Sequence, residues 1–323
     1  MFYRRKILLA LIEAFGGNLS RTDCQKLLFL FCLRRNRNYY DFFPHKYGCF
    51  SFLLAQDKDR LADLGFLVAQ KQFQLTKRQS FLYQLYLEDQ FALQNFVAEI
   101  GILRGEKLIR KAYLEYPYYA SRSEIADKVL RQAEYERVCK TRNITDIPCL
   151  FTIGYEGMTI DAYINVLLAN NVKVLVDVRK NPLSMKYGFS KTKFADYTRY
   201  AGILYFHIPE LGVPSKLRQN LSSPNAYNTL FDFYYTEILP NQKDAIARLR
   251  NILAEQKRVA ITCFEENPQF CHRHKIVEFL ENIDSFDTKV VHLNQFCISK
   301  DQLVYTNSEN VHLGLWDSKF EHS

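Results

Sequence analysis

The sequence predicts an α/β fold, with a mostly parallel sheet and flanking helices, preceded by a mainly helical domain of winged-helix type. Two observations carry this prediction. From residue 150 onward, short apolar runs alternate with helical patterns five times, which is typical of a parallel sheet with crossover helices. Before residue 150, three helical patterns precede a stretch of alternating apolar and polar residues, the order of a winged helix-turn-helix.

The N-terminal helices are predicted from their spacing and their end signals. RRKILLALIEAFGG has apolar residues at helical spacing and ends in glycine, and NLSRTDCQKLLFLFCLRR has Ser20 or Thr22 as its N-cap. After a loop rich in aromatic residues, SFLLAQDKDRLADLG predicts a third helix, and FLVAQKQFQLTKRQSFLYQL predicts a two-stranded ribbon. We therefore expect a winged-helix-like domain over residues 1–90 and a helical extension or linker over residues 91–149.

The basic excess of the chain lies entirely in its first half. The net charge is +8, and residues 1–150 hold 24 Lys and Arg against 16 Asp and Glu, whereas residues 151–323 hold 19 of each. This asymmetry is typical of a polyanion-binding domain joined to a neutral one, although a soluble surface or a protein-binding scaffold accounts for it too. We expect nucleic acid as the partner, DNA before RNA, with phosphate contacts from Arg34, Arg35, Arg37, Lys46, Lys71, Lys77 and Arg78.

The cysteines and the apolar runs indicate a reducing compartment. The eight cysteines are scattered through apolar patterns without a CxxC pair, so a disulfide framework is not expected. No stretch approaches the roughly 20 apolar residues of a membrane span, and the N-terminal apolar run lacks a signal-peptide cleavage site. We expect a cytoplasmic protein without membrane contact, and the sequence is compatible with an oligomer.

The second half is predicted as an α/β domain over residues 150–300, followed by a C-terminal tail over residues 301–323. Its strands are CLFTIGYEG, VKVLVDVR, ILYFHIPELG, KRVAITCFE and TKVVHL. Ligands bind at the carboxyl ends of parallel strands, and reactive side chains follow four of these strands. Polar residues also collect at strand ends by chance. We expect one site that contains Tyr155, Gly157, Asp177, Arg179, Asn181, Ser184, Tyr187, His207, Glu210, Cys263, Glu265, Cys271, His272 and Arg273.

Four motifs in this half resemble a known family. TIGYEG, LVDVRKNPLSMKYGFS, FHIPELG and TCFEENPQFCHR follow the order of the domain-of-unknown-function 488 family over roughly residues 150–282. The resemblance implies an α/β fold and a site but no settled reaction. The implied family positions are Gly154, Tyr155, Gly157, Asp177, Arg179, Asn181, Pro182, Ser184, His207, Pro209, Leu211, Gly212, Glu265, Cys271, His272 and Arg273.

The favoured function is an enzyme that acts on nucleic acid or nucleotides and cleaves or transfers at an N-glycosidic bond. Glu265 and Asp177 serve as paired catalytic carboxylates, since an oxocarbenium-like transition state needs little more. We expect Glu265 at the bottom of a cleft, with its carboxyl group within about 10 Å of that of Asp177. Arg179 and Arg273 then hold phosphates, and Tyr155 or Tyr187 stacks on the base.

Three alternatives remain open. A rhodanese-like or cysteine-phosphatase-like transferase would use Cys263 or Cys271, because a helix N-terminus lowers the pKa of a thiol. A non-catalytic DNA-binding protein would use the pocket to sense a nucleotide or modified base. A metal knuckle of Cys263, Cys271, His272 and His274 ranks last, because adjacent Cys and His without CxxC spacing is a poor ligand pattern. No metal and no cofactor are expected.

Overall fold

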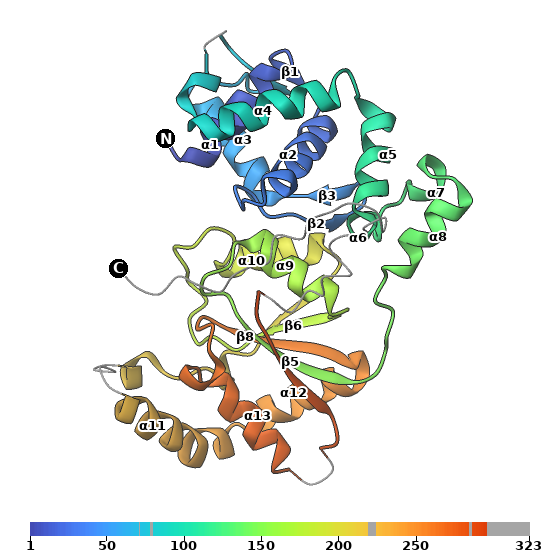
Figure 1. Ribbon diagram of the computed structural model, residues 1–323. Coiled ribbons are helices and arrows are strands. Elements are labelled where there is room, and N and C mark those ends of the chain that lie inside the picture. The colour runs from blue at the N-terminus through green and yellow to red at the C-terminus, as the bar shows by residue number, and fades with distance from the viewer. Residues whose placement is uncertain (71, 78–79, 219–223, 284–285, 296–323) are drawn as a thin grey trace.

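The computed structural model describes residues 1–70, 72–77, 80–218, 224–283 and 286–295. Figure 1 shows a helical N-terminal half, coloured blue to teal, above a sheet flanked by helices, coloured green to orange. Within the described ranges, no helix has both the length and the apolar character that a membrane span requires.

The second half contains a five-stranded parallel sheet. Its strands are β5 (Cys149–Gly154), β6 (Val174–Asp177), β7 (Leu204–His207), β8 (Arg258–Cys263) and β9 (Lys289–Leu293). They lie in the order β7-β6-β8-β5-β9, and every pairing between neighbours is parallel. The predicted α/β class and all five predicted strands are confirmed. Because β8 lies between β5 and β6, the carboxyl ends of these three strands are neighbours.

Helices cover both faces of the sheet. On one face, α9 (Ile160–Ala169) and α10 (Lys191–Tyr200) pack against side chains such as Phe151 and Leu175. On the other face, α12 (Lys243–Gln256) and α13 (Arg273–Glu281) pack against Leu150 and Val174. Adjacent strand residues thus point to opposite faces, and both faces are buried, which explains the near-continuous apolar runs.

Shorter helical segments connect the strands of this half. A 3-10 turn at Pro209–Leu211 follows β7, and others lie at Ser215–Arg218 and Pro268–Phe270. Helix α11 (Pro224–Phe233) continues into a π-helical turn at Tyr234–Ile238 and a 3-10 turn at Leu239–Asn241.

The N-terminal half begins with the three predicted helices α1 (Tyr3–Ala14), α2 (Arg21–Arg35) and α3 (Phe52–Asp63). Strand β1 (Asn18–Leu19) pairs antiparallel with β4 (Phe73–Gln74), and Leu67 bridges Leu75. The expected ribbon is therefore short, and the winged-helix assignment stays a prediction. The aromatic loop instead forms a hairpin of β2 (Phe43–His45) and β3 (Gly48–Phe50) between α2 and α3.

The middle of the chain is helical. A 3-10 turn at Leu82–Gln84 precedes α4 (Leu87–Ile100) and α5 (Gly105–Glu115), and α6 (Pro117–Ala120), α7 (Ala126–Val129) and α8 (Gln132–Lys140) follow. Leu93 and Phe96 of α4 and Leu108 of α5 share one hydrophobic core with α1 and α2. Helices α4 and α5 therefore complete the N-terminal core rather than separate it from the sheet.

The buried carboxylate of Asp161 joins the two halves. Asp161 lies in the first turn of α9 and accepts hydrogen bonds from the Ser51 hydroxyl (2.8 Å) and from the backbone N–H groups of Phe52 (2.6 Å) and Leu53 (3.0 Å). These two N–H groups belong to the first turn of α3, where helical N–H groups lack intrahelical partners. Burial raises the pKa of Asp161 to about 7. The contact fixes α3 on α9.

Candidate functional site

A cavity of about 360 Å³, here called the strand-end pocket, lies at the carboxyl ends of β5, β6 and β8. The residues that line it are Tyr155, Arg179, Lys180, Asn181, Leu183, Ser184, Met185, Val213, Ser215, Cys263, Phe264 and Glu265. Half of these were predicted as site residues: Tyr155, Arg179, Asn181, Ser184, Cys263 and Glu265. The parallel topology brings them together, since each follows one of the three neighbouring strands.

Asp177 does not act as a free carboxylate in this pocket. Its side chain is fully buried and receives Arg179 in a bidentate pair, with Nη2 to Oδ2 at 2.6 Å and Nε to Oδ1 at 2.8 Å. The Tyr205 hydroxyl also donates to Oδ2, at 2.6 Å, and the backbone N–H of Arg179 donates to Oδ1. The prediction that Asp177 pairs with Glu265 as a second catalytic acid is therefore not supported, because its oxygens are already occupied.

Arg179 is likewise occupied. Its Nη1 donates to the Tyr155 hydroxyl and to the Phe189 carbonyl, both at 2.9 Å, and its backbone carbonyl contacts Nε2 of His207 at 2.8 Å. The expectation that Arg179 binds phosphate loses its basis, since the guanidinium is buried and neutralised by Asp177. His207 and Tyr155 help to hold this ion pair. The adjacent cation in the pocket wall is Lys180, which is exposed.

Arg273 is also a structural residue rather than a phosphate ligand. Its side chain is completely buried, and it donates from Nη1 to the backbone carbonyl of Glu265 and from Nη2 to that of Glu266, the latter at 2.6 Å. Gly154 approaches the same segment so closely that a Cβ atom there would lie 1.8 Å from the Glu265 carbonyl oxygen. Arg273 and Gly154 thus fix the loop that carries Glu265.

The carboxyl group of Glu265, in the pocket wall, has a buried oxygen that is unsatisfied within the described residues. Its Oε2 atom is buried and has no hydrogen-bond partner among the described residues. Burial raises the pKa of this carboxyl, and the nearby Cys263 raises it further, whereas a hydrogen bond with Cys271 and the His272 ring oppose the shift.

Two thiols and an imidazole form a compact group behind the pocket, here called the Cys–His cluster: Cys263, Cys271 and His272. All three residues are buried, and their Sγ and Nδ1 atoms lie within 4.8 Å of one another. Nδ1 of His272 is 3.7 Å from the sulfur of Cys263 and 3.9 Å from that of Cys271. Nε2 of His272 contacts the Val178 carbonyl at 3.2 Å. Burial raises the pKa of the Cys271 thiol well above its usual value.

The remaining predicted residues lie outside the strand-end pocket. Gly157 is exposed, and Glu210 is exposed beside a different cavity. The Tyr187 hydroxyl contacts that of Tyr197 at 2.6 Å and the Phe52 carbonyl at 3.4 Å, so Tyr187 contacts the N-terminal half. His274 points its Nδ1 atom at the Cys271 carbonyl and does not join the Cys–His cluster.

Sequence reasoning missed half of the pocket lining. The residues not expected there are Lys180, Ser215 and four apolar residues, Leu183, Met185, Val213 and Phe264. Leu183 and Met185 are 85% and 104% exposed, respectively, which is unusual for side chains of their size beside a pocket. Both lie in the second family-like motif: Leu183 lies between Asn181 and Ser184, and Met185 follows Ser184. This position could have predicted that they line the pocket.

The basic side chains expected to contact nucleic acid are largely paired with acids. Arg34 contacts Glu99 at 2.6 Å and Glu115 at 3.2 Å. Ion pairs also join Arg35 to Asp89, Arg37 to Glu88 and Lys46 to Glu124. Lys77 is exposed, and Lys71 and Arg78 lie outside the described residues. Because most of these charges are neutralised locally, the predicted phosphate contacts gain no support from the structure and stay a prediction.

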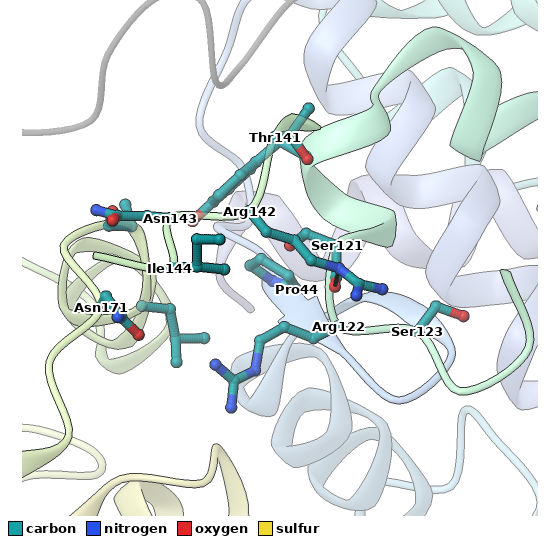
Figure 2. Close-up of a pocket in the computed structure, with 12 residues that line it drawn as sticks. Pro44, Ser121, Arg122, Ser123, Thr141, Arg142, Asn143, Ile144 and Asn171 are labelled. Atoms are coloured by element: carbon teal, nitrogen blue, oxygen red, sulfur yellow. Dashed lines mark hydrogen bonds between the residues drawn. The ribbon is translucent and has the colours of Figure 1, made fainter. Parts of the chain in front are cut away.

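A second cavity, of about 410 Å³, lies where the two halves meet (Figure 2). Arg122 and Arg142 line it, and their side chains donate to the backbone carbonyls of Ala201 and Ser121, respectively. Of the described residues that line this cavity, none is acidic. It contains none of the residues predicted for the site, so the junction is a basic surface separate from the strand-end pocket.

Comparison with known proteins gives one match. Comparisons with curated proteins and with solved structures found none. Residues 159–280 match the model of the family described as "Domain of unknown function DUF488". The match contains β6, β8 and the loop that carries Glu265, and it includes every residue that lines the strand-end pocket except Tyr155. The family resemblance is thereby confirmed over residues 159–280, which contain three of the four motifs, and TIGYEG lies just before the matched region.

Proposed function

We propose that the protein is an enzyme that cleaves an N-glycosidic bond in a nucleotide or nucleic acid, with Glu265 as its acid–base group. The position of Glu265 supports this most strongly. One carboxyl oxygen is buried without a partner among the described residues, in the wall of a pocket where a ligand fits. A buried, unsatisfied carboxyl oxygen destabilises the fold, so its retention at a pocket favours a role in binding or chemistry.

The composition of the pocket suits a ligand with a planar apolar part and a polar part. Its volume, about 360 Å³, lies in the range of small-molecule sites, roughly 300–1,000 Å³. Leu183, Met185 and Phe264 offer apolar contact for a base. Lys180 offers a positive charge for a phosphate, and Ser184 offers a hydroxyl for a sugar. Lys180 takes the role first assigned to the arginines, because its ammonium group is exposed.

The proposed reaction needs one carboxyl group rather than two. Protonated Glu265 donates its proton to the leaving base as the C1′–N bond breaks, and the electron pair of that bond goes to the base. A water oxygen then bonds to C1′, and the proton that this water loses returns to the Glu265 carboxylate. The Asp177–Arg179 pair contributes by holding the wall of the pocket.

A Glu265→Gln variant tests this proposal. The purified full-length chain is incubated with nucleotides and with single- and double-stranded DNA oligonucleotides, and released free base is measured by mass spectrometry. Glu265→Gln should lower base release about 100-fold or more and leave ligand affinity nearly unchanged. Glu266→Gln is the matched control, since Glu266 is the adjacent exposed acid. No base release by the unmodified protein, or equal rates for it and Glu265→Gln, would contradict the proposal.

A second candidate function is group transfer by a thiol. It is favoured by the 3.7 Å separation of the Cys263 sulfur from Nδ1 of His272, because an imidazole oriented by a third group is the usual activator of a nucleophilic cysteine. This candidate requires Cys263 to react selectively with iodoacetamide and Cys263→Ser to lose turnover. Unimpaired activity of Cys263→Ser would eliminate it.

A further inference from the structure

The Cys–His cluster has the donor atoms and the spacing of a transition-metal site. Around a tetrahedral zinc ion with Zn–S of about 2.3 Å and Zn–N of about 2.0–2.1 Å, the S···N edge is about 3.6 Å. The two S···N distances in the cluster are 3.7 and 3.9 Å, and all three donor atoms lie within 4.8 Å of one another. Shifts of a few tenths of an ångström would therefore bring both S···N distances to the tetrahedral value.

The histidine is already oriented as a metal ligand. A carbonyl oxygen only accepts hydrogen bonds, so the contact of Nε2 with the Val178 carbonyl places the ring proton on Nε2 in the neutral imidazole. The lone pair of Nδ1 then faces the two sulfurs. Metal-binding histidines usually donate their second ring N–H to a carbonyl or carboxylate in this way. This contact is independent of the distances among the three donor atoms.

The charge balance also suits a metal ion. Two thiolates and a neutral imidazole around a divalent cation have no net charge, so the buried assembly avoids most of the cost of an isolated buried ion. Two sulfurs and one nitrogen select zinc over the harder Mg²⁺ and Ca²⁺, which prefer oxygen ligands. Buried cysteine alone is common, but two cysteines converging on the Nδ1 atom of one histidine are not explained by packing.

Three protein ligands leave one coordination position of a tetrahedral ion unfilled. Within the described part of the chain, no carboxylate oxygen joins the three clustered donor atoms. Cys263 lies in both the cluster and the pocket wall, and Glu265 lines the same pocket two residues further on. A site with three protein ligands and one open position is typical of catalytic rather than structural zinc.

We propose that Cys263, Cys271 and His272 bind one zinc ion whose open coordination position faces the strand-end pocket, beside Glu265. The inference does not depend on the reaction proposed above. It bears on the second candidate function, because a zinc-bound Cys263 thiolate is not free to act as a nucleophile.

Metal analysis of the full-length protein tests the site. After expression with added zinc and purification without chelators or a histidine tag, elemental analysis should find about one zinc per chain. Cys263→Ser, Cys271→Ser and His272→Asn should each lose most of it. Cys149→Ser is the matched control, because Cys149 is a buried cysteine at the opposite end of β5 and should leave zinc unchanged.

Cobalt titration of the unmodified protein tests the site even if the variants fail to fold. Adding Co²⁺ to the chelator-treated, unmodified protein should produce thiolate-to-cobalt charge-transfer absorption and strong visible bands at about one equivalent. Zinc should abolish these bands and protect two cysteines from alkylation. A folded protein that shows no such absorption, or a Cys263–Cys271 disulfide in the protein purified under reducing conditions, would overturn the proposal.

The Glu265→Gln variant separates this inference from the proposed function. It should keep its zinc, since Glu265 lies beside the open position and is not a ligand. Loss of zinc in that variant would overturn the assignment of the open position. Retained zinc together with unimpaired base release would reject the proposed reaction and leave the metal site standing.

Discussion

A single methyl group at Gly154 should disrupt the loop that carries Glu265. The Cβ atom of Gly154→Ala would lie 1.8 Å from the carbonyl oxygen of Glu265, 2.5 Å from its carbonyl carbon and 3.0 Å from Cα of Glu266. Ordinary contact begins near 3.4 Å, so the loop must retreat by about 1.6 Å. All three neighbours are backbone atoms, and no side-chain rotation relieves the contact.

The loop cannot move without loss, because the buried guanidinium of Arg273 binds the carbonyls of Glu265 and Glu266. Hydrogen bonds to a charged group contribute about 1.5–3 kcal/mol each, and an unpaired buried charge costs more. We therefore expect Gly154→Ala to lower the free energy of unfolding by about 3 kcal/mol or more. It should also lower zinc content and ligand affinity, since Cys263 and Glu265 flank the displaced segment.

Urea unfolding followed by circular dichroism measures the change in stability, and elemental analysis measures the zinc. Gly157→Ala is the control. Gly157 lies in the turn that follows β5 and has a φ of +76°, but nothing lies within 4 Å of an added Cβ, so only backbone strain of about 1–2 kcal/mol is expected. If Gly154→Ala destabilises the protein no more than Gly157→Ala and keeps its zinc, the loop is not held as described.

Three further predictions concern charged groups. Asp177→Asn should lower the free energy of unfolding by about 3–5 kcal/mol in urea titrations, because it leaves a buried guanidinium without its carboxylate, and a loss below 1 kcal/mol would contradict this. The pKa of Asp161 is about 7 in the folded state and about 4 in the unfolded chain, so the free energy of unfolding should fall as pH rises from about 4 to about 7. Asp161→Asn should remove this fall. Parallel pH profiles of the unmodified protein and the variant would refute the prediction. Replacing Arg34, Arg35 and Arg37 together by alanine should change the affinity for duplex DNA less than about twofold, because each is paired with an acid. Fluorescence anisotropy measures this affinity. A steep, salt-dependent loss of affinity would support the predicted phosphate contacts.

The sheet and the position of the pocket were predictable because they depend on local patterns. Apolar runs mark strands buried on both faces, and parallel strands collect their carboxyl ends at one edge. The Asp177–Arg179 pair was also within reach of the sequence. Residues two apart on a strand point to the same side, so an acid and an arginine at that spacing are placed to bond each other. The expectation that Asp177 is a free catalytic carboxylate did not consider Arg179 as its partner.

Other features depend on contacts between distant residues. Arg34 meets Glu99 and Glu115, which follow it by 65 and 81 positions, so its neutralisation has no local signal. The proximity of Cys263, Cys271 and His272 likewise has no local signal, and the low ranking of a metal knuckle stays a prediction. That ranking relied on sequence spacing, whereas Cys263 and Cys271 meet because a loop returns from the end of β8 to the start of α13. Arg273 and Gly154, which hold that loop, come from separate motifs.

Several of the motif residues thus build the pocket rather than react in it. Gly154 admits the loop, Arg273 binds its carbonyl oxygens, and Asp177 and Arg179 neutralise each other beneath the wall. Once these are assigned to positioning, the groups left for chemistry are the buried carboxyl of Glu265 and the Cys–His cluster, two residues apart at Cys263 and Glu265. Gly154 and Arg273 both hold one short segment. Such support is expected when the side chains on that segment must be placed to within about 0.5 Å. The functional question for this domain therefore narrows to what binds between Glu265 and Cys263.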